Sequence, residues 1–212
     1  RSNLGRSQEI RRRLGISGKR IILFVGRLID FKGIREAVDA LALVRRVTPD
    51  ISMVVVGKGP LEDYVNTKCK ELSPNLVFLG SVEDDVLRDL YSIADVHILP
   101  SWHEAFGVVC AEALGFGVPS IVTRASGCSD LIVDGENGYL IDSRDSEQLA
   151  RAIGRVISSD DSLERMKMMA LATSADFEMV QIMNRVKRLI LLPLSQPMPM
   201  VTRLNSNPIL KT

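Results

Sequence analysis

Hydrophobic positions along the chain follow two alternating patterns. Short runs rich in β-branched and aliphatic residues each end at a glycine, a proline or a polar residue, which is typical of strands buried on both faces of a parallel sheet. The strands predicted in this way are residues 21–25, 51–56, 76–79, 96–99, 120–123 and 139–141. Between the first two, apolar residues recur at helical spacing across residues 34–47 (Ile34, Val38, Leu41, Val44).

Helical periodicity continues through the rest of the chain, at residues 61–72, 86–93, 108–116, 149–157 and 160 to about 190. Asp145 and Gln148 are spaced as a capping pair, and Pro60 stands where a helix is expected to begin. Strands and helices in alternation favour right-handed crossovers and a doubly wound sheet. The sequence therefore predicts an α/β fold, a Rossmann-like parallel six-stranded sheet over residues 1–190. An irregular, proline-containing tail is predicted over 191–212.

Composition narrows the classes of function. Among 212 residues, Lys and Arg total 27 and Asp and Glu 26, so the net charge of +1 provides no bulk field for nucleic acid. Cys69, Cys110 and Cys128 form no C-x-x-C motif, which argues against a disulfide framework or a zinc knuckle. No signal peptide or membrane-spanning run is recognisable. We expect a cytoplasmic protein that binds any anion locally.

Several familiar motifs are absent from the sequence. Residues 57–60 (GKGP) are followed by Glu62 where the dinucleotide fingerprint requires its third glycine. The chain contains no phosphate loop, no G-x-S-x-G and no H-E-x-x-H, and its only histidines are His97 and His103. No D-x-D supplies a carboxylate pair for a divalent cation. We expect neither a metal nor a cofactor.

Two cations follow the first predicted strand. Arg27 comes directly after Gly26, and Lys32 stands five residues later, before Gly33 and a helix. A guanidinium offers a planar fork for two oxygens, an ammonium is a compact charge, and glycines let the backbone approach an anion. The combination favours a diphosphate ligand, with two solvated surface charges as the alternative.

A helix start follows the fourth predicted strand. Residues 100–107 (PSWHEAFG) precede a helix that begins at Val108, whose unpaired amides suit a phosphate or hydroxyl oxygen. Glu112 lies inside this helix among Ala and Val, so it must be paired or bind a ligand. Its two oxygens match the vicinal hydroxyls of a ribose, and an ion pair with a distant arginine is the alternative. Packing explains Trp102 and His103 equally well.

Small and turn-forming residues follow the fifth strand, at 123–130, and precede the sixth, at 134–138. These loops are placed to line the same cleft. Ordinary turn chemistry is the simpler interpretation of both.

Taken in order, these residues resemble a known family. The segments 24–28 (FVGRL), 56–60 (VGKGP), 78–82 (FLGSV) and 90–95 (LYSIAD), with Lys32-Gly33 and above all residues 104–107 (EAFG) with Glu112, are similar to the C-terminal domain of retaining GT-B glycosyltransferases. This family includes glycogen synthases and mannosyltransferases. The resemblance extends from about residue 14 to residue 157.

The resemblance implies a nucleotide diphosphate sugar as donor, transferred with retention and without a metal. It implies catalytic roles for the side chains that hold the diphosphate and the transferred sugar, Arg27, Lys32 and Glu104. It implies nucleotide-sugar binding, from the base to the ribose and the sugar, by Gly26, Gly57, Val82, Phe106, Gly107, Val108 and Glu112.

The chain also departs from the family. It has Ser126-Gly127-Cys128 where paired glycines are common, and we expect the N-terminal acceptor domain of the family to be absent. Because the initiator Met is missing too, we expect a fragment that binds donor but transfers little sugar alone. The apolar run at 189–194 is expected to pack on that missing domain, with peripheral membrane contact as the alternative.

Two other functions compete with sugar transfer. A glycoside hydrolase would use Glu104 and Glu112 as acid and base, but eight residues of helix would separate them by about 12 Å, beyond the usual range. A non-catalytic nucleotide-sugar-binding or scaffold domain would keep the same pocket. The sequence does not separate this second alternative from an enzyme.

Overall fold

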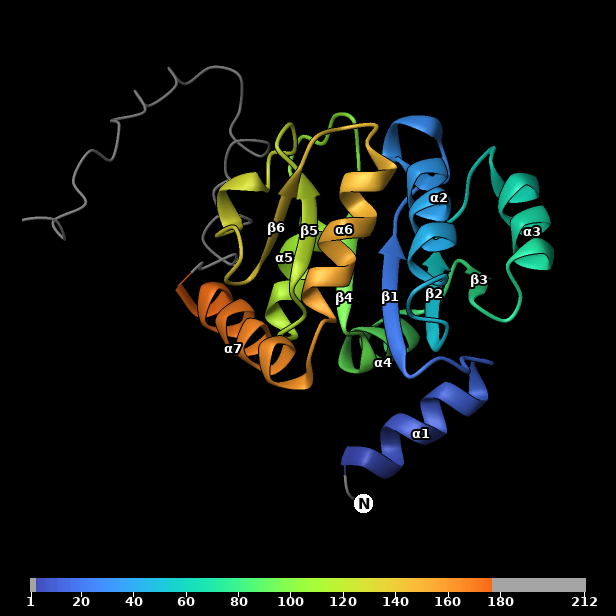
Figure 1. The fold of residues 1–212 in the computed structure, drawn as a ribbon, viewed down its shortest axis with the longest axis horizontal. Helices are drawn as coiled ribbons and strands as arrows, with labels where there is room; N and C mark the ends of the chain where they lie inside the picture. The colour runs from blue at the N-terminus through green and yellow to red at the C-terminus, as the bar shows by residue number, and fades with distance from the viewer. Residues whose placement is uncertain (1–2, 177–212) are drawn as a thin grey trace, which may run out of the picture. The chain divides into compact units, whose positions relative to one another are not determined.

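The computed structural model describes residues 3–176 as alternating helices and strands (Figure 1). The predicted strands are all present, as β1 (Arg20–Val25), β2 (Ile51–Val56), β3 (Leu76–Gly80), β4 (Val96–Leu99), β5 (Ser120–Thr123) and β6 (Gly138–Ile141). They pair in parallel in the order β3-β2-β1-β4-β5-β6. The predicted doubly wound sheet is confirmed. Its order reverses between β1 and β4, and ligands bind at such a switch point.

The predicted helices are present with shifted ends, as α2 (Ile34–Val44), α3 (Glu62–Glu71), α4 (Asp84–Ile93), α5 (Val108–Gly115), α6 (Ser146–Val156) and α7 (Asp160–Asp176). The cap pair is confirmed, since Asp145 Oδ1 accepts a 2.7 Å hydrogen bond from the Gln148 amide. α2 ends three residues early, because Val47 is 87% exposed and has no packing to extend the helix. Pro60 precedes α3 by two residues rather than opening it.

Some predictions concern residues that the structure does not describe. The continuation of the last helix to about residue 190, the tail at 191–212 and the apolar run at 189–194 lie outside the described residues. Within residues 3–176, no helix combines the length and the apolar character that crossing a bilayer requires.

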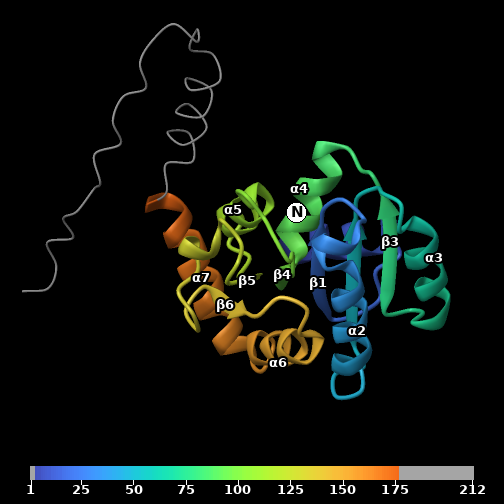
Figure 2. The ribbon, with the colours of Figure 1, turned by 90° about the horizontal axis from the view of Figure 1, so that it is seen from above.

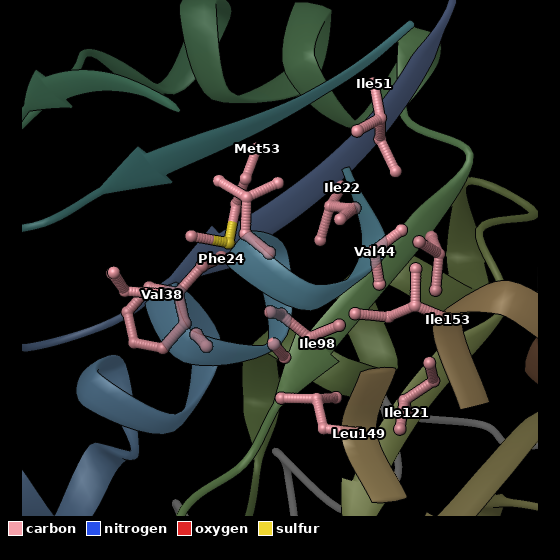
Figure 3. Close-up of a cluster of buried hydrophobic side chains, with 14 of the residues drawn as sticks. Ile22, Phe24, Val38, Val44, Ile51, Met53, Ile98, Ile121, Leu149 and Ile153 are labelled. Atoms are coloured by element: carbon pink, nitrogen blue, oxygen red, sulfur yellow. The ribbon is translucent and has the colours of Figure 1, made fainter. Parts of the chain in front are cut away.

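The sheet is covered on both faces (Figure 2). Alternate side chains of β1 serve the two faces: Ile22 and Phe24 pack in one cluster with α2, α3 and α6, and Ile21 and Leu23 in another with α1 and α4. Figure 3 shows the first cluster, in which side chains of the strands pack against side chains of α2 and α6 on one face of the sheet. Burial of a strand on both faces explains why the runs read as continuously hydrophobic.

An additional helix, α1 (Asn3–Arg13), was missed by the sequence analysis. It has almost no apolar periodicity, and among its residues 5–13 only the Ile10 side chain is buried, at 4% exposure. Ion pairs from Arg6 and Arg13 to Asp89 of α4 hold it in place, at 3.1 Å and 2.6 Å. Contacts between residues this far apart in the chain leave no local pattern.

Candidate functional site

The loops after β1 and β4 are joined at the switch point of the sheet. The Trp102 amide donates a 2.9 Å hydrogen bond to the Phe31 carbonyl. Gly33 has a φ of 72°, and a Cβ on it would lie 2.1 Å from the Pro100 carbonyl oxygen. Only glycine allows this left-handed turn and this close approach. The two strand ends that carried the candidate charges are therefore held side by side.

An ion pair between Lys32 and Glu104 crosses this junction. Both side chains are shielded from solvent, with 22% of Lys32 and 14% of Glu104 exposed. The Glu104 carbonyl accepts a 2.7 Å hydrogen bond from the Gly127 amide, which ties the backbone at Glu104 to the loop after β5. Two residues that the sequence placed on separate loops thus form one charged unit.

The start of α5 lies beside this unit. Gly107 takes the left-handed conformation at the N-cap, with a φ of 63°, and a Cβ there would lie 2.3 Å from Cys128 Sγ. Within residues 3–176 the amides of Phe106, Gly107 and Val108 have no hydrogen-bond partner. The Phe106 and Val108 side chains are 67% and 44% exposed. These amides are available to oxygen atoms of a ligand.

The loop after β5 supports the site and is not merely a turn. Thr123 Oγ1 donates to the Ser101 carbonyl at 2.7 Å and lies 3.0 Å from Ser126 Oγ. Ser126, where the family commonly has glycine, is therefore engaged with the strand end. In the turn at 134–138, the buried Asn137 side chain binds backbone at Val133 and Leu131, so the simple turn interpretation holds there.

A cavity of about 440 Å³ is lined in part by Arg27. Its walls are aliphatic, and its polar groups come from the ends of β1, β2 and β3. It is lined by Val25, Gly26, Arg27, Val56, Gly57, Lys58, Ser81, Val82 and Leu87. The residues that the resemblance assigned to the base, together with Arg27, are brought together here.

Glu112 lies on α5 and pairs with a tyrosine rather than an arginine. Tyr91 donates its hydroxyl proton to Glu112 Oε2 at 3.1 Å. Within the part of the chain that the structure describes, Glu112 has no ion-pair partner. The alternative of a buried ion pair with an arginine is therefore wrong for residues 3–176.

Trp102 and His97 are held by contacts within the fold. Trp102 Nε1 donates to Glu36 Oε1 at 2.8 Å, and the Arg144 guanidinium lies 4.0 Å from the centre of its ring. His97 is fully buried on β4, which lowers its pKa to about 3, while His103 is exposed. No group of three or more His, Cys, Asp or Glu side chains within residues 3–176 is arranged to hold a metal ion.

Sequence reasoning missed part of the lining. Lys58 and Ser81 stood inside quoted segments without a role, and Leu87 and Tyr91 were not singled out. Leu87 and Tyr91 are four residues apart on α4, so they lie on one face of the helix. A tyrosine hydroxyl on this otherwise apolar face is the signal that could have identified them. Lys58 gives no such signal, because an exposed lysine in a turn is common.

Comparison with known proteins agrees with this geometry. The sequence profile of the family described as glycosyl transferases group 1 matches residues 6–172. A D-inositol 3-phosphate glycosyltransferase of Corynebacterium diphtheriae is 32% identical over 180 residues, which cover 81% of this chain and 42% of that protein. The chain spans between 38% and 45% of the length of three curated relatives that it matches.

Solved structures give the same result. The C-terminal domain of the group 1 glycosyl transferase LpcC from Francisella tularensis superposes with a TM-score of 0.74 at 25% identity, covering 82% of this chain and 92% of that one. Anabaena Alr3699/HepE, solved in complex with UDP-glucose, gives 0.76 at 25% identity and coverages of 88% and 52%. The chain belongs to the glycosyl transferases group 1 family, and its fold is that of the C-terminal, Rossmann-like domain of a GT-B glycosyltransferase.

Proposed function

We propose that this chain is the donor-binding domain of a retaining, metal-independent glycosyltransferase whose donor is a nucleoside diphosphate sugar. The reaction breaks the bond between the anomeric carbon and a phosphate oxygen, and the electron pair goes to the diphosphate. An acceptor hydroxyl oxygen forms the new bond on the face that the diphosphate leaves, and its proton passes to the departing phosphate oxygen. Charge therefore builds on the leaving diphosphate, and the site must offset it.

Arg27 and Lys32 are proposed to hold the diphosphate. They leave one loop at the switch point, Arg27 at the mouth of the cavity and Lys32 beside the start of α5. Lys32 has three N–H donors and uses one or more on Glu104, so the ammonium still has donors for phosphate oxygens. Two fixed cations supply the electrostatic stabilisation for which other transferases use a divalent ion.

Glu104 and the α5 amides are proposed to hold the transferred sugar. Lys32 engages Glu104 Oε2, which leaves Oε1 to accept a sugar hydroxyl. The amides of Phe106, Gly107 and Val108 face the same junction as donors. A sugar presents both donors and acceptors, so a carboxylate next to unpaired amides suits it.

The cavity is proposed to hold the nucleoside. The base would lie between aliphatic side chains such as Val82 and the backbone at Gly26 and Gly57. The ribose would lie toward Glu112, which α4 links to the cavity through Leu87 and Tyr91. The single observation that carries the proposal is the Lys32–Glu104 pair across the β1 and β4 ends, with Lys32 on the same β1 loop as Arg27, which lines the cavity.

Titration calorimetry tests the diphosphate assignment. We expect UDP to bind this chain more tightly than UMP, and Arg27→Ala to remove most of the difference, about 1.5–3 kcal/mol for a charge-assisted hydrogen bond. Arg46→Ala is the matched control, because Arg46 is exposed beyond the far end of α2. Equal affinity of the wild-type chain for UDP and UMP would contradict the proposal.

Retention and metal independence are tested on the product that the intact protein forms. A product with the anomeric configuration of the donor, made equally fast in EDTA, supports the proposal. Inversion at the anomeric carbon would contradict retention, and loss of activity in EDTA would contradict metal independence. Tight donor binding without transfer by the intact protein would favour a non-catalytic binding domain.

A further inference from the structure

The carboxylate proposed to bind ribose is held by one buried side chain. Tyr91 is 2% exposed, and its hydroxyl lies 3.1 Å from Glu112 Oε2. The same hydroxyl lies 3.4 Å from the Val109 carbonyl oxygen, a longer and weaker contact. A tyrosine hydroxyl has a single proton to donate. The shorter distance and the charge of the acceptor direct that proton to Glu112.

The Tyr91 ring cannot move away from this position easily. It stacks on Phe116, with ring centroids 5.4 Å apart and an interplanar angle of 21°. It also belongs to the packed cluster that joins α4 to β1 and β2. Burial, and then the negative charge of Glu112, raise the pKa of Tyr91, so the hydroxyl keeps its proton and remains a donor at neutral pH.

Tyr91 also connects Glu112 to the cavity. Leu87 lines the cavity and precedes Tyr91 by four residues on α4, so the two side chains lie on one face of the helix. The anchor, Tyr91, therefore lies one helical turn from a residue of the cavity wall. Without the anchor, a glutamate side chain has three rotatable bonds and many orientations.

We propose that Tyr91 is a positioning residue that fixes Glu112 for the two ribose hydroxyls of the nucleotide. This inference rests on the proposed function. Oε2 binds Tyr91 and keeps a second lone pair, and Oε1 is unoccupied by any described side chain. The carboxylate therefore presents both oxygens to vicinal hydroxyls in one orientation, and the ordering entropy is lost on folding rather than on binding.

The test compares ribose with deoxyribose ligands. For the wild-type chain we expect UDP to bind at least tenfold more tightly than 2′,3′-dideoxy-UDP, as for hydrogen bonds to a charged group. Tyr91→Phe should weaken UDP about tenfold and 2′,3′-dideoxy-UDP less than twofold. Tyr139→Phe is the matched control, because Tyr139 is a half-buried tyrosine on β6, at the end of the sheet away from the cavity. It should change neither affinity.

A double-mutant cycle separates positioning from a structural effect. In a Glu112→Gln background, Tyr91→Phe should no longer change the preference for ribose. An equal loss for both ligands, or the same preference for ribose in Tyr91→Phe as in wild type, would overturn the role of Tyr91. If the wild-type chain itself binds UDP no better than pyrophosphate, the proposed function fails instead.

If Tyr91→Phe does not fold, Glu112→Asp provides a second test of the proposal. Glu112→Asp keeps Tyr91 and the carboxylate but shortens the side chain, so it should lose the hydrogen bond and the ribose preference together. Full ribose preference in Glu112→Asp would contradict the need for an anchored carboxylate. Thermal unfolding of each variant identifies the ones that are folded before binding is measured.

Discussion

The two ends of the site are lined by chemically different groups. The cavity end, at β1, β2 and β3, is formed by backbone and aliphatic side chains such as Val25, Val56 and Val82. The junction end, at β4 and α5, is formed by the Lys32–Glu104 ion pair and unpaired amides. An apolar cavity recognises a flat base by shape, whereas charges and amides recognise oxygens. Arg27 lines the cavity and leaves the same β1 loop as Lys32, so it is the residue best placed to serve both.

The difference follows from the loops. β2 and β3 are joined to their helices by the short segments 57–61 and 81–83, and the glycines at 57, 59 and 80 place no side chain at these strand ends. β4 is followed by residues 100–107 before α5 begins, and this longer connection brings Glu104 over the sheet edge. The short loops after β2 and β3 thus leave space for a cavity, and the longer loop after β4 supplies the Glu104 carboxylate.

The largest expected effect comes from the contact that joins the two ends. Gly33→Ala places a Cβ 2.1 Å from the Pro100 carbonyl oxygen at a φ of 72°. Strain and overpacking should lower the free energy of unfolding by about 3 kcal/mol, measured by urea denaturation. Gly154→Ala in α6 is the control, because no atom lies within 4 Å of its Cβ, and it should stabilise the protein by about 0.5–1 kcal/mol. Unchanged stability in Gly33→Ala would show that the loops after β1 and β4 are not in close contact at Gly33 and Pro100.

The second prediction concerns the strand beneath the junction end. Burial lowers the pKa of His97 to about 3, whereas an unfolded histidine titrates near pH 6.5. Between these values the unfolded state binds more protons, so stability should fall as the pH falls, by up to about 1.4 kcal/mol per pH unit. Urea midpoints at pH 7.5 and 5.5 measure this loss. His103→Gln should leave the slope unchanged, because His103 is exposed, and a flat profile in the wild type would contradict a neutral, buried His97.

The third prediction separates sugar from diphosphate at the junction end. Glu104→Gln removes the negative partner of Lys32. UDP affinity should stay the same or rise up to about twofold, while the advantage of UDP-glucose over UDP should fall about fivefold. Glu147→Gln on the exposed face of α6 should leave both affinities unchanged. Equal losses for UDP and UDP-glucose would place Glu104 with the diphosphate instead.

The smallest effect is expected at the cavity end. Val82→Ala removes part of an aliphatic wall and should weaken UDP by about 0.5–1 kcal/mol, or roughly threefold, with no effect on pyrophosphate. Val47→Ala is the control, since Val47 is 87% exposed. Calorimetry with both ligands measures the effect. A loss for pyrophosphate as large as that for UDP would mean that the two ends are not chemically distinct.

The sheet was predictable because each buried strand carries its own pattern. Residues 51–56 are apolar except for Ser52 and are followed by Gly57, and they form β2 with every residue buried. Arg27 and Lys32 were also found from sequence, because charges at strand ends stand out against such runs. Local signals of this kind depend only on neighbouring residues.

Features that depend on distant residues were not predictable. Lys32 and Glu104 are 72 positions apart, and Tyr91 and Glu112 are 21 apart, so no periodicity joins them. α1 was missed for the same reason, since Asp89 holds it from another part of the chain. Sequence reasoning thus found the candidate residues, and the fold supplied their partners.

The central claim is that both ends of the site bind one donor molecule, and backbone amide NMR tests it most directly. During titration with UDP-glucose, the amides of Gly26 and Gly57 at the cavity end and of Phe106 and Gly107 at the junction end should shift along the same saturation curve, with one Kd. UDP should shift the cavity amides fully and the junction amides less. Two different dissociation constants, or shifts at only one end, would contradict the claim.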